Sequence, residues 1–212
     1  MAESKSARLD AVVLAAGAGR RFSEHGAGRK LLAPFEGRPL IAGALDAAFA
    51  APVRRVVLVT AGDADLARIA AQHAAARGRQ DDLDIAVAID AAEGMGASLR
   101  TAVNALPTEG RGVFVFLGDM PRVPAGLAGD LAQALTPGVD AVAPCFDGRR
   151  GHPVLFGQAC FPALRGLAGD AGARRVLAEL GDRLAMVESP NAGVLFDVDR
   201  PEDLAAARQD EA

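Results

Sequence analysis

Aromatic residues other than phenylalanine are missing from this chain of 212 residues, which has nine phenylalanines and neither tryptophan nor tyrosine. Proteins that bind single-stranded nucleic acids stack bases on aromatic side chains, and nucleic-acid-binding domains usually have an excess of basic residues. This chain has 23 basic and 27 acidic residues, which gives a formal net charge of −4. The composition therefore argues against binding to nucleic acid or to anionic membranes.

Cysteine and long apolar runs are also scarce. Cys145 and Cys160 are too few and wrongly spaced for a zinc site or a disulfide framework, so we interpret both as small apolar residues. Although 50% of the residues are hydrophobic, no run approaches the roughly 18 apolar residues of a membrane-spanning helix. The N-terminal sequence MAESKSARLD lacks the apolar segment of a secretory signal, so we expect a cytoplasmic protein.

A chain of this length can bury most of its apolar surface in one core. We expect one domain over residues 9–208, preceded by a disordered or loosely ordered N-terminus at residues 1–8. Strands are predicted at residues 11–16, 53–60, 83–89, 113–117, 140–143, 153–156, 184–188 and 194–198. Helices are predicted at residues 40–49, 64–77, 98–106, 124–135 and 171–180, and from Pro201. This alternation is typical of a doubly wound, mostly parallel sheet, with 153–156 as an antiparallel or edge strand.

The loop after the first strand combines glycine with positive charge. Its members of these two kinds are Gly17, Gly19, Gly26, Gly28, Arg20, Arg21, Arg29 and Lys30. Glycines let a backbone approach a ligand closely, and the basic side chains can balance the charge of a polyphosphate. Open α/β sheets bind ligands at the carboxyl ends of their strands, which is where this loop begins. The alternative is an ordinary glycine-rich surface loop with solvated cations.

Two common phosphate-binding motifs do not match this loop. A P-loop needs Ser or Thr after its lysine, but Lys30 is followed by Leu31. The dinucleotide fingerprint needs a third glycine where the chain has Phe22, and an acidic residue about 20 residues further on, whereas Asp63 comes far too late. Neither motif is therefore present.

Acidic residues follow two of the predicted strands. Asp119 comes directly after the strand 113–117, in the sequence GDMP. Because Mg²⁺ prefers one or two carboxylates together with phosphate oxygens and waters, Asp119 is a candidate metal ligand; its alternative role is to cap the following turn. Asp197 and Asp199 close the last predicted strand. We expect only one of them to face the crevice and favour Asp199, which lies at the end of the strand.

Three further residues could contact ligands. Gly94 would let a flat ligand approach, and Ser98 offers a hydroxyl at a helix N-terminus, where its alternative role is a helix cap. His152, taken alone, is most simply a surface or structural residue.

These motifs resemble those of the MobA/MocA-like nucleotidyltransferases, in particular the molybdenum-cofactor cytidylyltransferases. The similar segments are LAAG at 14–17 with Arg21, Phe22 and Lys30-Leu-Leu, then GMGASLR at 94–100, GDMP at 118–121, GHPVLF at 151–156 and DVDRPEDL at 197–204. The chain departs from the family pattern in two places: residues 23–29 lengthen the spacing from arginine to lysine, and Arg200 replaces a threonine.

The resemblance implies a single-domain, Rossmann-like, three-layer α/β/α fold with a mostly parallel mixed sheet, as in nucleotide-diphospho-sugar transferases. It implies Mg²⁺-dependent transfer of a nucleoside monophosphate to a phosphate acceptor, molybdopterin or the molybdenum cofactor, with release of pyrophosphate. The alanine pair in LAAG, where guanylyl-transferring relatives have LAGG, favours CTP over GTP as the donor. A molybdoenzyme or its maturation factor would be the protein partner.

The resemblance also implies roles for individual residues. Catalytic roles are expected for Arg21, Lys30 and Asp119, and metal binding for Asp119 and Asp199. Nucleotide contacts are expected from Leu14, Ala15, Ala16, Gly17, Gly19, Arg21, Lys30, Gly94, Ser98 and Gly118. Gly151 and His152 are expected to contact the acceptor.

Two alternative functions remain open. One is cytidylyl transfer to a sugar or polyol phosphate, as in the isoprenoid-pathway enzymes, which have a similar LAAG loop. The other is a non-catalytic nucleotide sensor or a cofactor-binding maturation chaperone. Lys30, Asp119 and Asp199 argue against the second, because a pure binder does not need metal-binding carboxylates. The enzymatic readings require that the cationic loop and the carboxylates share one cleft.

Overall fold

The computed structural model describes residues 9–17, 19, 22, 29–107, 109–169 and 172–206. The predictions for residues 1–8, for Arg21 and for nearly all of the 23–29 insertion therefore lie outside the described residues. None of the described helices is both long and apolar enough to cross a membrane.

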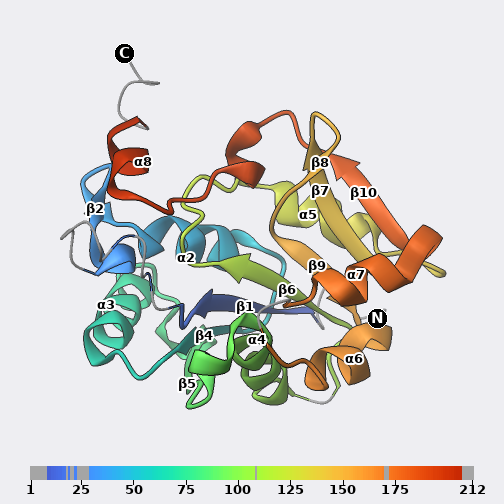
Figure 1. Ribbon diagram of the computed structural model, residues 1–212, viewed down its shortest axis with the longest axis horizontal. Coiled ribbons are helices and arrows are strands. Elements are labelled where there is room, and N and C mark those ends of the chain that lie inside the picture. Colours follow the sequence, from blue (N-terminus) through green and yellow to red (C-terminus); the bar gives the residue numbers. More distant parts are fainter. Residues whose placement is uncertain are drawn as a thin grey trace.

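A mixed sheet forms the middle layer of the molecule (Figure 1). Its strands are β1 (Leu9–Ala15), β4 (Val56–Thr60), β5 (Leu83–Val87), β6 (Gly112–Leu117), β7 (Ala141–Phe146), β8 (Arg149–Arg150), β9 (Val154–Gly157) and β10 (Leu184–Glu188). Their order is β10-β7-β9-β6-β1-β4-β5, and the short β8 pairs with β7. The pairs that involve β8 or β9 are antiparallel and the others are parallel. The predicted mostly parallel sheet is confirmed, and β9 is the antiparallel strand expected at 153–156, in the interior of the sheet and not at its edge.

Helices cover both faces of this sheet. On one face α2 (Ile41–Ala50), α3 (Ala64–Ala75) and α5 (Leu127–Ala134) pack against strand residues such as Val13 and Leu58. On the other face α4 (Met95–Asn104), α6 (Phe161–Arg165) and α7 (Arg174–Leu180) pack against Val12 and Val57. Neighbouring residues of a buried strand point to opposite faces, so continuous apolar strands supply both cores. The three-layer α/β/α fold is confirmed.

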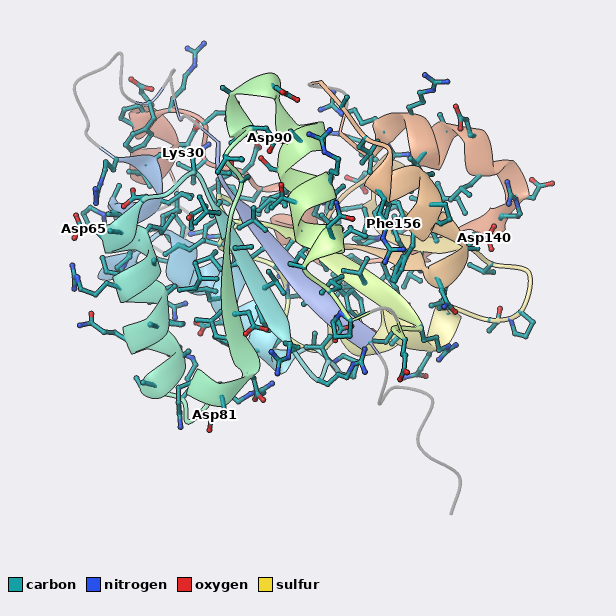
Figure 2. The ribbon with its side chains drawn as sticks, turned by 90° about the horizontal axis from the view of Figure 1, so that it is seen from below. Lys30, Asp65, Asp81, Asp90, Asp140 and Phe156 are labelled. Carbon is teal, nitrogen blue, oxygen red and sulfur yellow. The ribbon has the colours of Figure 1, made fainter. Side chains whose placement is uncertain are left out.

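The direction in which strands are added to the sheet reverses at β1. The chain passes from β1 to β4 on one side, and later forms β6 on the other side. In open α/β sheets, ligands bind beyond the carboxyl ends of the strands at such a reversal. Figure 2 shows Lys30 at the end of the sheet where Asp90 follows β5, whereas Asp81, which precedes β5, lies at the opposite end. The loop after β1 and the turn after β6 therefore meet at one crevice.

The prediction of a strand at residues 194–198 is wrong. The segment begins as a 3₁₀ helix, Ala192–Leu195, and continues without a strand partner. Its backbone bonds to a turn instead of a neighbouring strand: the N–H of His152 donates to the carbonyl of Val194 at 2.9 Å. The five residues, VLFDV, are mostly apolar, and such a short segment is compatible with a strand or with the observed conformation, because the tertiary partner decides between them.

A small apolar cluster joins the loop after β1 to the C-terminal segment. Its buried members are Phe22, Ala33, Phe35, Leu40 and Val198. Leu204 of α8 (Pro201–Ala206) packs against it. Phe35 belongs to a hairpin of β2 (Pro34–Phe35) and β3 (Arg38–Pro39), and Figure 1 shows α8 beside this hairpin. The cluster thus holds two distant parts of the chain next to the crevice.

Close packing at Gly43 in α2 leads to a stability prediction. A Cβ atom on Gly43 would lie 2.2 Å from the carbonyl oxygen of Pro121, whereas one on Gly129 in α5 would meet nothing within 4 Å. Gly43→Ala should lower the free energy of unfolding by about 1–3 kcal/mol through overpacking. Gly129→Ala should raise it by roughly 0.5–1 kcal/mol, because alanine favours a helix. Urea unfolding of both variants checks this, and equal effects would contradict the packing argument.

Candidate functional site

The turn after β6 places Asp119 at the crevice. The N–H of Gly118 donates to the carbonyl of Leu14 at the end of β1 (2.9 Å), and the carbonyl of Asp119 accepts from the N–H of Val198 (3.0 Å). A Cβ atom on Gly118 would lie 2.9 Å from Cδ1 of Ile41 and 3.0 Å from the Leu14 oxygen. Packing alone therefore explains the glycine, and its contact with a nucleotide stays a prediction.

Lys30 lies between two of the predicted carboxylates. Its Nζ is 2.7 Å from Oδ2 of Asp119 and 3.2 Å from Oδ1 of Asp199. The Lys30 side chain is only 11% exposed, against 28% for Asp119 and 44% for Asp199. The cationic loop and the two acidic segments thus meet in one place, although they are separated by 89 and 169 residues in the chain.

Asp197 lies close to the same group, which corrects the expectation that only one of Asp197 and Asp199 faces the crevice. Residues two apart in an extended segment point to the same side, and the intervening Val198 is buried in the apolar cluster on the opposite side. Burial raises the pKa of Asp197, and the negative charges of Asp199 and Asp119 raise it further. Two carboxylates therefore pair with the Lys30 ammonium, and a third lies near enough to be affected by their charges.

The donor set fits a divalent cation of the magnesium type. Such ions take one or two carboxylates and complete their coordination with phosphate oxygens and water. Asp119 and Asp199 already converge on one cationic atom, the Nζ of Lys30. Within the described ranges no three Asp, Glu, His or Cys side chains form a ready-made metal cage. The arrangement suits an ion that shares its ligands with a bound phosphate.

A cavity of about 370 Å³ opens beside this group. Leu14, Met120 and Asp197 line it, and Met120 and Asp197 lie one and two residues from Asp119 and Asp199 in the chain. Its apolar wall comes from Leu99, Val115, Leu117, Val154, Phe156 and Leu177. The exposed side chains of Arg149, Arg150 and Arg174 give its rim positive charge. The cavity can hold a largely apolar molecule that carries negative charge at one end.

His152 is fixed in the wall of this cavity. A Cβ atom on Gly151 would lie 2.3 Å from the carbonyl oxygen of Val194, so the backbone before His152 packs directly on the 3₁₀ helix. Burial lowers the pKa of His152, although a backbone hydrogen bond with Val115 and the charge of Asp119 oppose this shift. Its Nδ1 is buried and has no hydrogen-bond partner among the residues that the structure describes. The imidazole is therefore neutral at pH 7.

The residues of LAAG present mainly backbone to the crevice. Ala15 packs into one core and Ala16 into the other, each less than 10% exposed. Leu14 lines the cavity, and Gly17 is exposed. Gly19 has φ +54°, and a Cβ atom there would lie 3.3 Å from Cβ of Lys30. Small residues are thus required on both sides of the chain where it enters the loop.

The predicted base-contact segment lies at the start of α4. Gly94 precedes the helix with φ 120°, a conformation that favours glycine. Ser98 is buried inside the helix, and the N-cap residue is Gly94. The alternative prediction that Ser98 caps the helix is therefore wrong. Arg100 pairs with the carboxylate of Asp90 and donates to the carbonyl of Leu167 at 2.5 Å. These contacts fix the loop between β5 and α4.

Sequence reasoning missed three residues that line the cavity. Arg149 and Arg150 directly precede the GHP motif, so their position next to Gly151 is a signal that could have identified them. Arg174 lies in a predicted helix and gives no local signal. The expectation that only Asp199 faces the crevice overlooks the spacing of Asp197 and Asp199, since residues two apart in an extended segment lie on one side.

A family model described as "MobA-like NTP transferase domain" matches residues 11–184 of the chain. The chain is 32% identical over 209 residues to the purine catabolism protein PucB of Bacillus subtilis (strain 168), covering 97% of this chain and 98% of that protein. It is 30% identical over 200 residues to nicotine blue oxidoreductase of Paenarthrobacter nicotinovorans, covering 91% and 93%. It is 30% identical over 120 residues to the molybdenum cofactor cytidylyltransferase of Escherichia coli (strain K12), covering 57% and 59%.

Two solved structures have a similar fold. Rv0371c from Mycobacterium tuberculosis H37Rv in complex with manganese superposes with a TM-score of 0.73 at 25% identity, covering 94% of this chain and 97% of that one. A nucleotidyl transferase from Methanothermobacter thermautotroptrophicus gives a TM-score of 0.76 at 23% identity, covering 96% and 97%. The second similarity concerns the fold alone.

The lowered pKa of His152 predicts a pH dependence of stability. Below the ordinary histidine pKa of 6.5, this histidine binds a proton in the unfolded chain but not in the folded chain. The free energy of unfolding therefore decreases as the pH falls. This residue can contribute a slope of up to about 1.4 kcal/mol per pH unit. His152→Gln should flatten the fall in the free energy of unfolding between pH 7 and pH 5.5. Urea unfolding at pH 8, where both proteins are neutral at this position, measures the packing cost separately; an unchanged slope would contradict the prediction.

Proposed function

Because the chain belongs to the MobA-like NTP transferase family and is a nucleotidyltransferase, we propose that it transfers CMP from CTP to the phosphate of molybdopterin, releasing pyrophosphate. The observation that carries the proposal is the meeting of Lys30, Asp119 and Asp199 beside a cavity with a cationic rim. The carboxylates and the lysine suit a metal-bound triphosphate, and the cavity suits the second substrate.

The triphosphate would bind over the loop that follows β1. A side chain at Gly17 would meet nothing within 4 Å, so phosphate oxygens have room near the backbone there, and the Lys30 ammonium can balance part of their charge. The cytosine would lie towards Gly94 and Ser98, at the start of α4. Arg21, which lies outside the described residues, would add a second positive charge to the phosphates.

Asp119 and Asp199 would hold Mg²⁺, since they converge on one cationic position. When bound, such an ion supplies positive charge that stabilises the charge developing on phosphate oxygens during an in-line displacement. The chain's own contribution is geometric: backbone hydrogen bonds fix Gly118 to β1 and Asp119 to Val198. This position favours alignment of the two substrates, which is the main source of catalysis in phosphoryl and nucleotidyl transfer.

The reaction needs no general base. An oxygen of the acceptor's phosphate monoester forms a bond to the α-phosphorus, while the bond from that phosphorus to the oxygen of the β-phosphate breaks. Pyrophosphate leaves with the electron pair. A phosphate dianion is already deprotonated, so charge neutralisation by Lys30 and alignment of the two substrates are sufficient. The neutral His152 is consistent with a binding role.

The cavity supports an acceptor with a flat, weakly polar body and a phosphate group. Its apolar wall can cover a ring system, and the guanidinium groups of Arg150 and Arg174 can bind phosphate oxygens. Molybdopterin has both parts, and the GHP motif and the similarity to a molybdenum cofactor cytidylyltransferase support this choice. The side nearest Lys30 is where the acceptor phosphate would meet the α-phosphate of CTP.

Pyrophosphate release tests the proposal directly. The protein is incubated with Mg²⁺, molybdopterin and one of CTP, GTP, ATP or UTP, and a second series replaces molybdopterin with a sugar or polyol phosphate. We expect release with CTP and molybdopterin, and a cytidine dinucleotide form of the cofactor as product. If pyrophosphate is released only with a sugar or polyol phosphate, molybdopterin is not the acceptor. If CTP binds but no pyrophosphate is released under any condition, the protein is not a catalyst.

Replacing Asp119 tests the role of the carboxylate in turnover. Asp119→Asn should reduce the transfer rate by roughly 10²–10³-fold, because it removes a charge that orients the reacting groups. Asp130→Asn, at an exposed position in α5, is the matched control and should keep the rate. Circular dichroism and thermal unfolding check that both variants fold. Full activity of folded Asp119→Asn would remove this residue from catalysis.

Replacing Arg174 and its neighbour Arg175 in turn distinguishes a specific loss of acceptor binding from a general effect of removing one positive charge. Arg174 lines the cavity, whereas Arg175 is exposed and pairs with Glu179 at 2.8 Å. Arg174→Ala should raise the KM for the acceptor roughly tenfold and leave the KM for CTP unchanged, because one charged hydrogen bond to phosphate is lost. Arg175→Ala should change neither value. A change in the KM for CTP with Arg174→Ala would place the donor, and not the acceptor, in the cavity.

A further inference from the structure

The charges around Lys30 do not balance. The carboxylates of Asp119 and Asp199 both pair with the ammonium of Lys30, and Asp197, two residues before Asp199, lines the adjacent cavity. The ammonium of Lys30 is held at 2.7 Å from Asp119 and at 3.2 Å from Asp199. Lys30 thus partly neutralises the acidic group in the protein without nucleotide.

A divalent cation would need the same oxygen atoms. Mg²⁺ binds carboxylate oxygens at about 2.0–2.1 Å, in strict octahedral geometry. An ammonium that keeps a hydrogen bond to Oδ2 of Asp119 would then lie against a doubly charged ion, and the two cations would repel each other. Metal binding and the present position of Lys30 therefore oppose each other.

Lys30 is the partner that can move. The backbone at Asp119 is fixed by its hydrogen bond to Val198, and Gly118 is fixed to Leu14. Lys30 carries its charge on a flexible four-carbon stem and binds as a point charge, so it can exchange one anionic partner for another. Its neighbour Arg29 remains anchored elsewhere, since it pairs with Asp65 at 2.7 Å and with Asp63 at 3.3 Å.

We propose that Lys30 occupies the metal carboxylates in the nucleotide-free protein and releases them when a triphosphate offers its ammonium a new partner. This proposal rests on the nucleotidyltransferase function given above. Metal and nucleotide then bind as a coupled pair, and the free protein discriminates against a metal ion that arrives alone. Because coupling between two binding sites is reciprocal, the metal also tightens the binding of the nucleotide.

The affinity of the nucleotide-free protein for Mn²⁺ tests the proposal without any reaction. The electron paramagnetic resonance signal of free Mn²⁺ is titrated with wild-type protein, Lys30→Met and Arg29→Met. Methionine keeps much of the length of lysine and removes the charge. Lys30→Met should bind Mn²⁺ roughly tenfold more tightly than wild type, a change within the usual range of coupling between sites.

Arg29→Met is the matched control for loss of one positive charge from the same loop. It should leave the Mn²⁺ affinity within about twofold of wild type, because Arg29 pairs with Asp63 and Asp65 and a distant exposed charge is screened. Lys30→Arg keeps the charge and should remain near wild type. The double variant Lys30→Met with Asp119→Asn should not show this gain in Mn²⁺ affinity. That result would assign the gain to the Asp119 carboxylate.

Two results would overturn the proposal. One is a Lys30→Met protein that is folded, as judged by thermal unfolding, and binds Mn²⁺ no more tightly than Arg29→Met. The other is a gain in affinity that survives Asp119→Asn. Failure of the proposed function gives a different result. If the variants show the expected order of Mn²⁺ affinities but the wild-type protein releases no pyrophosphate, the proposed acceptor or activity is wrong, whereas the proposed exchange of Lys30 still holds.

Discussion

Two backbone hydrogen bonds at the turn after β6 hold the candidate site together. One runs from the N–H of Gly118 to the carbonyl of Leu14, and the other from the N–H of Val198 to the carbonyl of Asp119. They join the first strand, the central GDMP turn and the C-terminal segment. The Lys30 ammonium then connects the carboxylates that this frame positions. Backbone contacts of this kind do not depend on ionic strength, so the frame persists when the ion pairs change partners.

The site has two halves that meet at this frame. The loop after β1 and the start of α4 form the half suited to a nucleotide, where small residues leave the backbone accessible. The half suited to the acceptor is the cavity between β6, β9 and α7, with its apolar wall and cationic rim. Since Asp119 and Asp197 lie at the boundary, the two substrates would approach each other where the negative and positive groups of the protein are most concentrated.

The sequence allowed the layers of the fold to be predicted because the parallel strands are buried on both faces and appear as continuous apolar runs. Tertiary packing decided what could not be predicted. The run at 194–198 bonds to the turns before β9 and after β6, so it forms no strand. Arg174 reaches the site only because α7 packs beside the cavity. Position 118 must be glycine because the side chain of Ile41 in α2 leaves no room for a Cβ atom there. Asp197 could have been placed correctly from its spacing alone.

In the proposed function, one cleft at the carboxyl ends of β1 and β6 holds the metal, the triphosphate and the acceptor. Anomalous diffraction from crystals grown with Mn²⁺ and a CTP analogue, in which the bond between the α- and β-phosphates cannot be cleaved, tests this arrangement. We expect a manganese peak next to Asp119 and Asp199, with the Lys30 ammonium moved onto the triphosphate and the cytosine near Gly94. A manganese peak remote from both carboxylates, or a nucleotide bound outside the loop after β1, would contradict it.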